Sequence, residues 1–350
     1  MIIAGEASGD LHGSKLVDAM REKDKNLFFC GIGGKALEEA GVRIIVDASQ
    51  LAVVGLTEVF SKIPSLFRGM AVSKKLLNSL QPDLLIIIDF PDFNLNVAAA
   101  AKKTGISVLY YISPQLWAWR PGRVNKIRKL VDHVAVILPF EEDFYNQHHV
   151  RASFVGHPLL DTHLAIEESL ATTKTEDIPF VGLLPGSRDR EIARLLPVML
   201  QSARILLKRD NSIKFIISAA LSVKRKFVET IVEEHGGGHH FEIVSEPVES
   251  VLKRCRLVVV ASGTATLEAA IYGIPMIIIY KMSPVTYWLG RMLVRSRVKY
   301  FGLVNLIAGR EISPELLQNN VTPKKIADIA FEMLNDAPGL EKIKNELLGL

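Results

Sequence analysis

Short runs of Val, Ile and Leu alternate along the chain with longer segments in which apolar residues recur at helical spacing. Runs that are apolar on both faces are typical of strands in a parallel sheet that helices cover on both sides. The pattern predicts strands at residues 1–4, 27–31, 43–46, 84–88, 108–112, 133–138, 180–184, 214–219, 242–244, 257–261 and 276–280. We therefore predict an α/β fold in which a doubly wound parallel sheet occurs twice.

A polar segment without strand character separates the two series of strands, between Val155 and Pro179. We place the domain boundary there, with one Rossmann-like domain at residues 1–160 and a second at 161–320. The length of 350 residues agrees with this division, because it is too long for one ordinary core. We expect the two domains to face each other across a cleft between the carboxyl ends of their strands.

Composition narrows the class of protein further. The net charge of +4 is compatible with an anionic ligand or membrane surface and is too small to indicate nucleic acid. Cys30 and Cys255 lack the spacing of a zinc site or a redox pair, so we expect buried thiols in a reducing compartment. No basic segment precedes the first apolar strand and no apolar run approaches ~18 residues, so neither a signal peptide nor a membrane span is expected.

The first candidate site lies in the loop that follows the first predicted strand, within AGEASGD. We expect Gly5 and Gly9 to let the backbone turn close to a ligand, with Glu6 and Ser8 in the cleft. A tight turn before a helix that starts near Asp10, with Ser8 or Asp10 as its N-cap, is the alternative.

Asp89 follows the apolar run 84–88, within IDFPDFN. Burial raises the pKa of a carboxyl group and makes the carboxylate a better base, so Asp89 is the candidate catalytic residue. The alternative is a carboxylate that only accepts hydrogen bonds from loop amides. We expect Asp92 to cap the following helix. Residues 31–41 lack the spacing of a phosphate-binding P-loop, so we expect a glycine turn before a helix there.

A candidate anion site opens the second half of the chain, within LLPGSRDREI. We expect Gly186 to turn the chain after a strand, Ser187 to cap the next helix, and Arg188 to lie at that helix N-terminus. Backbone amides, the helix dipole and a guanidinium then converge without a metal. A plain cap beside a solvated arginine is the alternative.

A second helix N-terminus follows the buried strand 257–261, within ASGTATLE. The small residues Ser262, Gly263 and Thr264 leave this N-terminus open for a diphosphate. Glu268 lies one turn into the helix, where a carboxylate can reach a ribose diol. An ordinary strand–turn–helix connection is the alternative.

Aromatic and cationic side chains follow the predicted strand 108–112, where they suit a sugar or a phosphate. Ordinary packing of the tryptophans is the alternative. His157 lies at the domain joint and is a candidate phosphate or hinge contact. The candidates for this part of the cleft are Ser113, Trp117, Arg120, Arg123 and His157.

Residues 58–77 and 281–300 mix basic with bulky apolar residues. Such stripes are typical of a core, and the competing interpretation is a patch that dips into anionic lipid. The chain has neither H-E-x-x-H nor D-x-D, so we expect no metal or other cofactor. The candidate membrane patch comprises Ile63, Leu66, Phe67, Met70, Trp288, Arg291 and Arg295.

Taken in order, these motifs resemble the lipid A disaccharide synthase family of membrane-associated glycosyltransferases. The resemblance covers nearly the whole chain and rests on AGEASGD, IDFPDFN, YISPQLWAWR, RVNKI, LPFE, FVGHPLLD, LLPGSR, ASGTATLE and NLIAGRE.

The resemblance implies a metal-independent, inverting GT-B enzyme with an acceptor-side first domain and a UDP-sugar-binding second domain. It implies UDP-2,3-diacylglucosamine as donor, 2,3-diacylglucosamine-1-phosphate as acceptor, and a β-1′,6-linked disaccharide-1-phosphate and UDP as products. It implies that Asp89 is the base and that Asn305 holds the diphosphate.

The resemblance also implies peripheral attachment to the cytoplasmic face of a bacterial inner membrane and leaves a homodimer open. Helices in residues 321–350 are expected to pack toward the first domain or a partner subunit. Family members usually continue beyond Leu350 with another helix.

Two other classes of protein fit the same motifs. A non-hydrolysing 2-epimerase on this fold acts on the UDP-sugar itself and needs no acceptor. A non-catalytic protein that binds a nucleotide sugar or a membrane tolerates the loss of Asp89.

Overall fold

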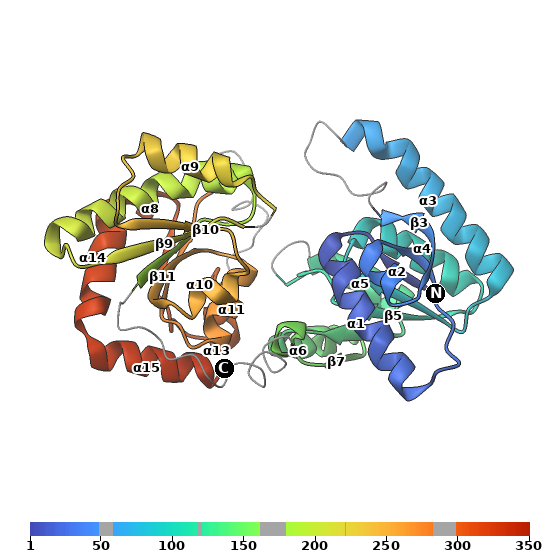
Figure 1. Cartoon of the computed structure of the whole chain (residues 1–350). Coiled ribbons are helices and arrows are strands. Elements are labelled where there is room, and N and C mark those ends of the chain that lie inside the picture. The colour runs from blue at the N-terminus through green and yellow to red at the C-terminus, as the bar shows by residue number, and fades with distance from the viewer. Residues whose placement is uncertain (49–58, 118–120, 162–179, 221, 283–298) are drawn as a thin grey trace. The chain divides into compact units, whose positions relative to one another are not determined.

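The computed structural model describes residues 1–48, 59–117, 121–161, 180–220, 222–282 and 299–350 (Figure 1). The chain divides into two compact units, Met1–Pro158 and Leu159–Leu350. Each unit is an α/β structure built on its own parallel sheet.

The first unit has a seven-stranded parallel sheet in the order β3-β2-β1-β4-β5-β6-β7. Its strands are β1 Ile2–Ala4, β2 Cys30–Gly33, β3 Arg43–Asp47, β4 Leu84–Ile88, β5 Ser107–Tyr111, β6 His133–Val136 and β7 Ala152–Phe154. Its helices are α1 Ala7–Lys23, α2 Lys35–Glu39, α3 Val59–Leu80, α4 Pro91–Lys103, the 3-10 helix η2 Pro121–Arg123, α5 Val124–Leu130 and α6 Pro139–Gln147.

The central strands of this sheet are buried on both faces, as their apolar runs predict. Along β4, Leu85 and Ile87 face one hydrophobic cluster, and Ile86 and Ile88 face another. Successive side chains of a strand point to opposite faces, so an unbroken apolar run fills both clusters.

Strand β2 lies three residues later than predicted, at Cys30–Gly33. A Cβ atom on Gly31 would lie 1.8 Å from the carbonyl oxygen of Ile2, so only glycine lets β2 approach β1 there. The expected glycine turn therefore begins later, and Gly34 precedes the first residue of α2.

The second unit has a six-stranded parallel sheet in the order β10-β9-β8-β11-β12-β13. Its strands are β8 Phe180–Leu184, β9 Lys214–Ser218, β10 Phe241–Val244, β11 Cys255–Ala261, β12 Met276–Tyr280 and β13 Glu315–Leu317. Its helices are α8 Asp189–Arg209, α9 Arg225–Glu234, α10 Val248–Leu252, α11 Thr264–Ile271, α13 Leu303–Ala308, the 3-10 helix η3 Gln318–Asn320, α14 Pro323–Asn335 and α15 Ala337–Leu348.

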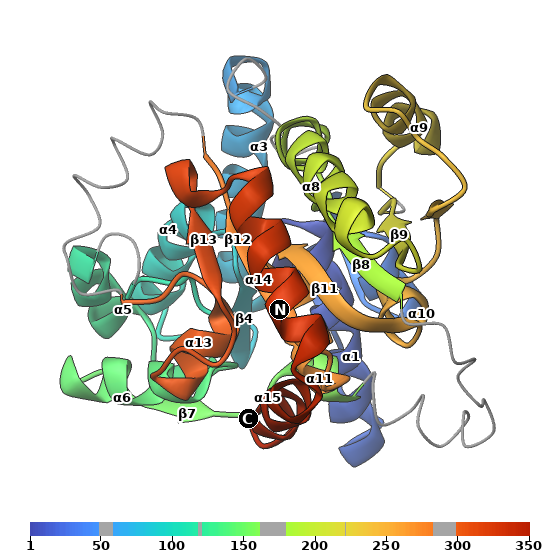
Figure 2. The ribbon, with the colours of Figure 1, turned by 90° about the vertical axis from the view of Figure 1, so that its left-hand side faces the viewer.

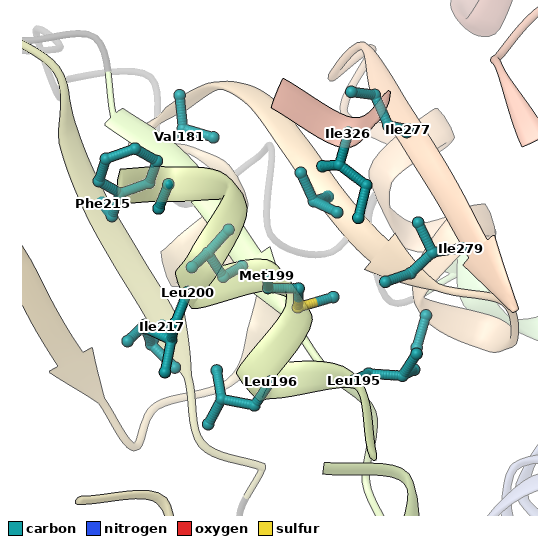
Figure 3. Packing of buried hydrophobic residues seen from close by; sticks show 14 of the residues in the cluster. Val181, Leu195, Leu196, Met199, Leu200, Phe215, Ile217, Ile277, Ile279 and Ile326 are labelled. Atoms are coloured by element: carbon teal, nitrogen blue, oxygen red, sulfur yellow. The ribbon is translucent and has the colours of Figure 1, made fainter. Parts of the chain in front are cut away.

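Helix α8 supplies much of the core of the second unit (Figure 3). Its residues Leu195, Leu196, Met199 and Leu200 recur at helical spacing and are at most 3% exposed. They pack toward β8, β9 and β12, which fixes the start of α8 at the carboxyl edge of the sheet.

The two C-terminal helices, predicted as a segment at 321–350, are part of this unit. Their packing toward the first domain or a partner subunit stays a prediction. Helix α14 lies beside α8 over one face of the sheet (Figure 2). Its Ile326, Ala327 and Ala330 are buried in the same cluster as α8, and Leu347 of α15 is buried in the cluster on the other face. Their apolar stripes therefore find partners within the unit to which their sequence connects them.

Candidate active site

In each sheet the chain first adds strands on one side of its first strand and then continues on the other side. The first strand is β1 in one unit and β8 in the other. In open parallel sheets, ligands bind beyond the carboxyl ends of the strands at this point. The first strand on the other side is β4 in one unit and β11 in the other. Each unit therefore has one candidate subsite, formed by the two segments that follow these neighbouring strands. The predicted residues Glu6, Asp89, Arg188 and Thr264 follow these four strands closely.

Asp89 follows the last residue of β4 and is half-buried. Burial raises the pKa of its carboxyl group above the ordinary value of 3.8, while the backbone amide of Phe90 opposes this shift. A carboxylate with a raised pKa is a stronger base. The position and environment of Asp89 therefore suit proton abstraction.

The backbone at Asp89 is left-handed, with φ of 45° at Asp89 and 44° at Phe90. Residues other than glycine rarely adopt this conformation, which costs about 1–3 kcal/mol at each position. The Asp89 amide donates to the carbonyl oxygen of Ile112 at 3.2 Å, and Ile112 is itself left-handed with φ of 55°. Such strain gathers at functional sites, where the surrounding structure has to maintain it.

Gly5, after β1, makes room for the residue that follows Asp89. A Cβ atom on Gly5 would lie 2.4 Å from Cδ1 of Phe90, and one on Gly9 would lie 3.3 Å from Cγ2 of Ile88. Both glycines therefore allow close packing between the first loop and the end of β4. This role differs from the predicted approach to a ligand.

The rest of AGEASGD also departs from expectation. Helix α1 begins at Ala7, so Ser8 lies in its first turn and is exposed, and the exposed Glu6 is the N-cap residue with extended backbone. Asp10 is buried, and its carboxylate accepts hydrogen bonds from the amides of Gly34 and Ala36, at 2.5 and 2.9 Å. It thus caps α2, a different helix from the one that contains it.

Predicted site residues in the loop after β5 are buried or packed against other side chains of the first unit. Trp117 donates from Nε1 to Oε1 of Glu141 at 3.0 Å, and its ring packs edge-on against Phe140. Ser113 is buried. These contacts correspond to the alternative of ordinary packing, and Arg120 lies outside the described residues.

Contacts correct one further prediction for this unit. Arg123 pairs with Asp92, with 2.6 Å between Nη2 and Oδ1, so Asp92 holds the loop and does not cap α4. Burial and the neighbouring His12 lower the pKa of His157 to about 4. His157 is therefore neutral at pH 7, and its role as a phosphate or hinge contact stays a prediction.

Three buried residues have no role that the sequence predicted: Glu141, Asn94 and Tyr110. Asn94 and Tyr110 hydrogen-bond the Asp89 carbonyl oxygen, and Glu141 anchors Trp117. Glu141 also accepts from the amide of Leu138, the N-cap residue of α6. The acid three residues after Leu138 was the available sequence signal for that cap.

Stability is expected to fall with rising pH because of Glu141. Burial raises the pKa of this carboxyl group from 4.5 to about 7, against hydrogen bonds from Trp117, Leu138 and Ile137 that lower it. Between these two values the folded state holds more protons than the unfolded state, so the free energy of unfolding declines as pH rises, by about 3 kcal/mol. Denaturant titrations at pH 5 and pH 8 measure the decline.

Glu141→Gln should remove most of that difference between pH 5 and pH 8. Asp143→Asn is the matched control, because Asp143 lies on the same helix and is exposed. A pH dependence that Glu141→Gln leaves unchanged would contradict the assignment to Glu141.

In the second unit, the loop after β8 turns at Gly186, with φ of 111°. Arg188 is the N-cap residue of α8, and Ser187 precedes it with its carbonyl oxygen bonded to the Ser222 hydroxyl at 2.9 Å. Ser187 therefore does not have the predicted capping role. The exposed Arg188 guanidinium pairs with Glu191, with 3.2 Å between Nη1 and Oε1. Amides, helix dipole and guanidinium still converge here, as an anion requires.

The second helix N-terminus follows β11. Gly263 and Thr264 are exposed, and a Cβ atom on Gly263 would have no described heavy atom within 4 Å. The small residues thus leave the first turn of α11 open. Glu268 is half-buried, and burial followed by the charge of Glu249 raises the pKa of its carboxyl group.

Asn305 has a structural role that speaks against the predicted contact with a diphosphate. Its side chain is fully buried and donates to the Ser313 carbonyl oxygen and to Oε1 of Glu315, both at 2.7 Å. Its Oδ1 accepts from the amides of Ile312 and Ser313, at 2.8 and 3.0 Å. All its hydrogen-bonding groups are thus used within the protein.

The candidate membrane-patch residues on α3 differ in their exposure. Phe67 is 72% exposed, whereas Leu66 and Met70 pack against the core of the first unit. Those two residues therefore follow the alternative of a core stripe. The remaining candidates lie outside the described side chains: Ile63, Trp288, Arg291 and Arg295. Where the chain is described, no helix is both long and apolar enough to cross a bilayer.

Across the described residues, no three His, Cys, Asp or Glu side chains gather in a way that could hold a metal ion. In the second unit, the groups available to an anion are Arg188 and the backbone amides at the N-termini of α8 and α11. These groups bind phosphate oxygens directly.

The paired Rossmann-type sheets define a two-domain fold of the GT-B type. Solved structures with this fold include Acinetobacter baumannii MurG, with a TM-score of 0.60 and 12% identity over 100% of this chain and 94% of that one. They also include the UDP-GlcNAc 2-epimerase of Neisseria meningitidis, with a TM-score of 0.61 and 11% identity over 97% of this chain and 92% of that one. The model of the lipid-A-disaccharide synthetase family matches residues 1–347, and the chain belongs to that family.

Curated relatives agree with this assignment. The lipid-A-disaccharide synthase of Geobacter metallireducens is 45% identical over 98% of this chain and 90% of its own length. That of Syntrophus aciditrophicus is 46% identical over 99% of this chain and 91% of its own length. The predicted family, fold class and enzyme class are confirmed.

Proposed function

We propose that the enzyme transfers 2,3-diacylglucosamine from UDP to the 6-hydroxyl of 2,3-diacylglucosamine-1-phosphate. The names of the relatives support a lipid A disaccharide as product. The observation that carries the proposal is Asp89, a half-buried carboxylate with a raised pKa at the carboxyl end of β4. The first unit then receives the acceptor, and the second unit receives the donor.

In the proposed step, Asp89 takes the proton of the acceptor 6-hydroxyl. The hydroxyl oxygen forms a bond to C1 of the donor sugar while the bond from C1 to the diphosphate oxygen breaks. Attack on the face opposite the leaving group inverts C1, which gives a β-1′,6 linkage and UDP. General-base assistance of this kind contributes about 10²–10⁴ in rate.

UDP leaves with additional negative charge on its diphosphate. Arg188 and the N-termini of α8 and α11 offer a guanidinium and unpaired helix amides to that charge. Gly186, Ser187, Ser262, Gly263 and Thr264 keep the backbone accessible there. Preorganised donors at a developing charge stabilise the transition state and take over the role that a metal ion has in other transferases.

Glu268 is proposed to bind the ribose. It lies one turn inside α11, and burial raises the pKa of its carboxyl group. A carboxyl group in this position accepts hydrogen bonds from a vicinal diol. Glu6 and Ser8 are exposed beside Asp89 and are proposed to contact the acceptor.

Acceptor dependence separates this function from that of a 2-epimerase. Purified enzyme with UDP-2,3-diacylglucosamine should release UDP only when 2,3-diacylglucosamine-1-phosphate is also present. Conversion of the UDP-sugar without an acceptor would support the epimerase interpretation. Binding of the donor without any reaction, when both substrates are supplied, would support a binding protein.

Attachment to the inner membrane is proposed to involve α3. Phe67 is exposed beside the exposed Arg68, and Lys74 and Lys75 follow on the same helix. An exposed aromatic ring among cations suits the interface of an anionic bilayer. The patch would let the acyl chains remain partly in lipid while the sugars react.

Phe67→Ser is expected to lower co-sedimentation with anionic liposomes about threefold or more. An aromatic side chain that inserts into the bilayer interface contributes substantially to binding. The thermal midpoint should stay within about 2 °C, because Phe67 is exposed. Leu66→Ser is the contrasting variant, since Leu66 packs against the core and its loss should lower the midpoint instead. Unchanged liposome binding by Phe67→Ser would contradict the patch.

A further inference from the structure

Two buried side chains donate to a single backbone atom at the candidate base. The carbonyl oxygen of Asp89 accepts hydrogen bonds from Nδ2 of Asn94 at 2.7 Å and from the Tyr110 hydroxyl at 2.8 Å. Asn94 comes from α4, and Tyr110 comes from β5. Both side chains are 0% exposed, so their partners are within the protein.

This oxygen belongs to the peptide that joins two left-handed residues, Asp89 and Phe90. Fixing the peptide plane fixes ψ of Asp89 and restricts φ of Phe90. On its other side, Asp89 is held by the bond from its amide to the Ile112 carbonyl oxygen. The Phe90 ring is held against Gly5 and stacks on Phe93 with 5.2 Å between ring centroids.

We propose that Asn94 and Tyr110 are positioning residues, which hold the strained peptide after Asp89 so that its carboxylate meets the acceptor hydroxyl. The inference rests on the proposed role of Asp89 as the base. A carboxyl group on a relaxed loop samples many orientations, whereas proton transfer requires hydrogen-bond contact with the reacting group.

The side chain of Asn94 is better suited to donating than to filling space. Its Nδ2 also donates to the Ile88 carbonyl oxygen at 3.0 Å, so one amide group spans the last two carbonyls before Phe90. Its Oδ1 is buried without a partner among the described residues. An acceptor without a partner contributes nothing to stability, so the contribution of the Asn94 side chain comes from its two donated hydrogen bonds.

Tyr110→Phe is the primary test, because it removes one hydroxyl and keeps the ring in its buried position. We expect kcat to fall roughly 10- to 100-fold, the scale of a misplaced catalytic group. KM for both substrates should stay within about twofold, since Tyr110 is buried away from them. Rates of disaccharide formation at varied concentrations of each substrate measure this split.

The pH profile supplies a readout that a general loss of stability would not produce. A relaxed loop lets water reach the Asp89 carboxylate, which lowers its pKa toward the ordinary value. The acid limb of kcat/KM should therefore move to lower pH in Tyr110→Phe. The titratable groups that influence Tyr110 are Asp89, Tyr145, Arg123 and Asp92.

Asn94→Ala tests the second donor, and the double variant tests whether both act on the same peptide. Because they share one acceptor, the double variant should lose less than the product of the two single losses. Tyr145→Phe is the matched control. It removes a similarly buried hydroxyl that lies beside Ser113, and wild-type kcat is expected.

Asp89→Asn, measured in parallel, distinguishes a failure of the positioning proposal from a failure of the proposed role of Asp89 as the base. If Asp89→Asn is inactive while Tyr110→Phe and Asn94→Ala keep the wild-type kcat and acid limb, positioning is refuted and the base assignment stands. Equal losses in Tyr110→Phe and Tyr145→Phe would also refute positioning, since any lost buried hydroxyl would then suffice. Wild-type activity in Asp89→Asn would show that Asp89 is not the base, and the positioning proposal would fail with it.

Discussion

Asp89→Asn is expected to lower turnover at least ~100-fold, which is the scale of the loss of a general base. The amide side chain has nearly the shape of the carboxylate but accepts no proton. The bonds that hold the local backbone involve the Asp89 amide and carbonyl groups, which the substitution leaves in place. UDP affinity should stay within about twofold, because the proposed diphosphate contacts lie in the second unit. Steady-state rates and calorimetric UDP titration measure the two quantities.

Asp83→Asn is the matched control for this substitution. Asp83 is exposed and precedes β4, so it lies at the opposite end of the strand from Asp89. Its turnover should equal that of the wild type. In the wild type, the rate should fall as pH drops through the pKa of Asp89, which burial places above the usual value. Near-normal turnover by Asp89→Asn would exclude it as the base.

Asn305→Ala is expected to lower the free energy of unfolding by on the order of 3 kcal/mol. The substitution removes two donated bonds, to Ser313 and Glu315, and two accepted bonds, from Ile312 and Ser313. Glu315 meanwhile accepts hydrogen bonds from the amides of Phe301 and Gly302, which immediately precede α13, at 2.9 and 3.0 Å. Loss of Asn305 therefore leaves a carboxylate and two buried amides with fewer partners.

Denaturant titration and UDP binding together decide the role of Asn305. Asn335→Ala is the control, since Asn335 is exposed and its side chain donates to the Phe331 carbonyl oxygen at 2.8 Å. It should cost no more than about 0.5 kcal/mol. If Asn305→Ala keeps its stability but loses UDP affinity tenfold, the structural role is refuted. The predicted contact between Asn305 and the diphosphate is then supported.

The sequence predicted the central strands well because burial leaves a strong signal. The predicted bounds of β4, β8 and β12 agree with the structure residue for residue. These strands need apolar side chains on both faces, so their runs are unbroken. The edge strands β7 and β13 were missed, because each has three residues, only partly buried, and neither forms a continuous apolar run.

The location of the candidate site was predictable, but the contacts within it were not. Asp89 and Arg188 each follow a predicted strand, so each was expected at the carboxyl edge of its own sheet. The partners of Trp117, Arg123 and Asn305 come from segments distant in the sequence or from folded loops, which periodicity does not reveal. The left-handed backbone at Asp89 is equally hidden, since aspartate has no strong preference for it.

The motif residues also divide into two kinds that the sequence does not distinguish. Gly5, Gly9, Asp10 and Asn94 belong to the motifs that carry the family resemblance, yet each packs or hydrogen-bonds within the protein. Gly5, Gly9 and Asn94 shape the loop from which Asp89 emerges, whereas Asp10 holds the start of α2. The chemistry is assigned to a smaller set that is exposed or half-buried beside them, which includes Asp89 and Arg188.

The most direct test is the product itself. Purified enzyme is mixed with UDP-2,3-diacylglucosamine and 2,3-diacylglucosamine-1-phosphate in detergent with EDTA, and the lipid products are examined by mass spectrometry and proton NMR. The account predicts a tetraacyl disaccharide-1-phosphate with a β-1′,6 linkage, formed only when both substrates are present. An α linkage, or a reaction that EDTA abolishes, would contradict inverting transfer by Asp89 without a metal.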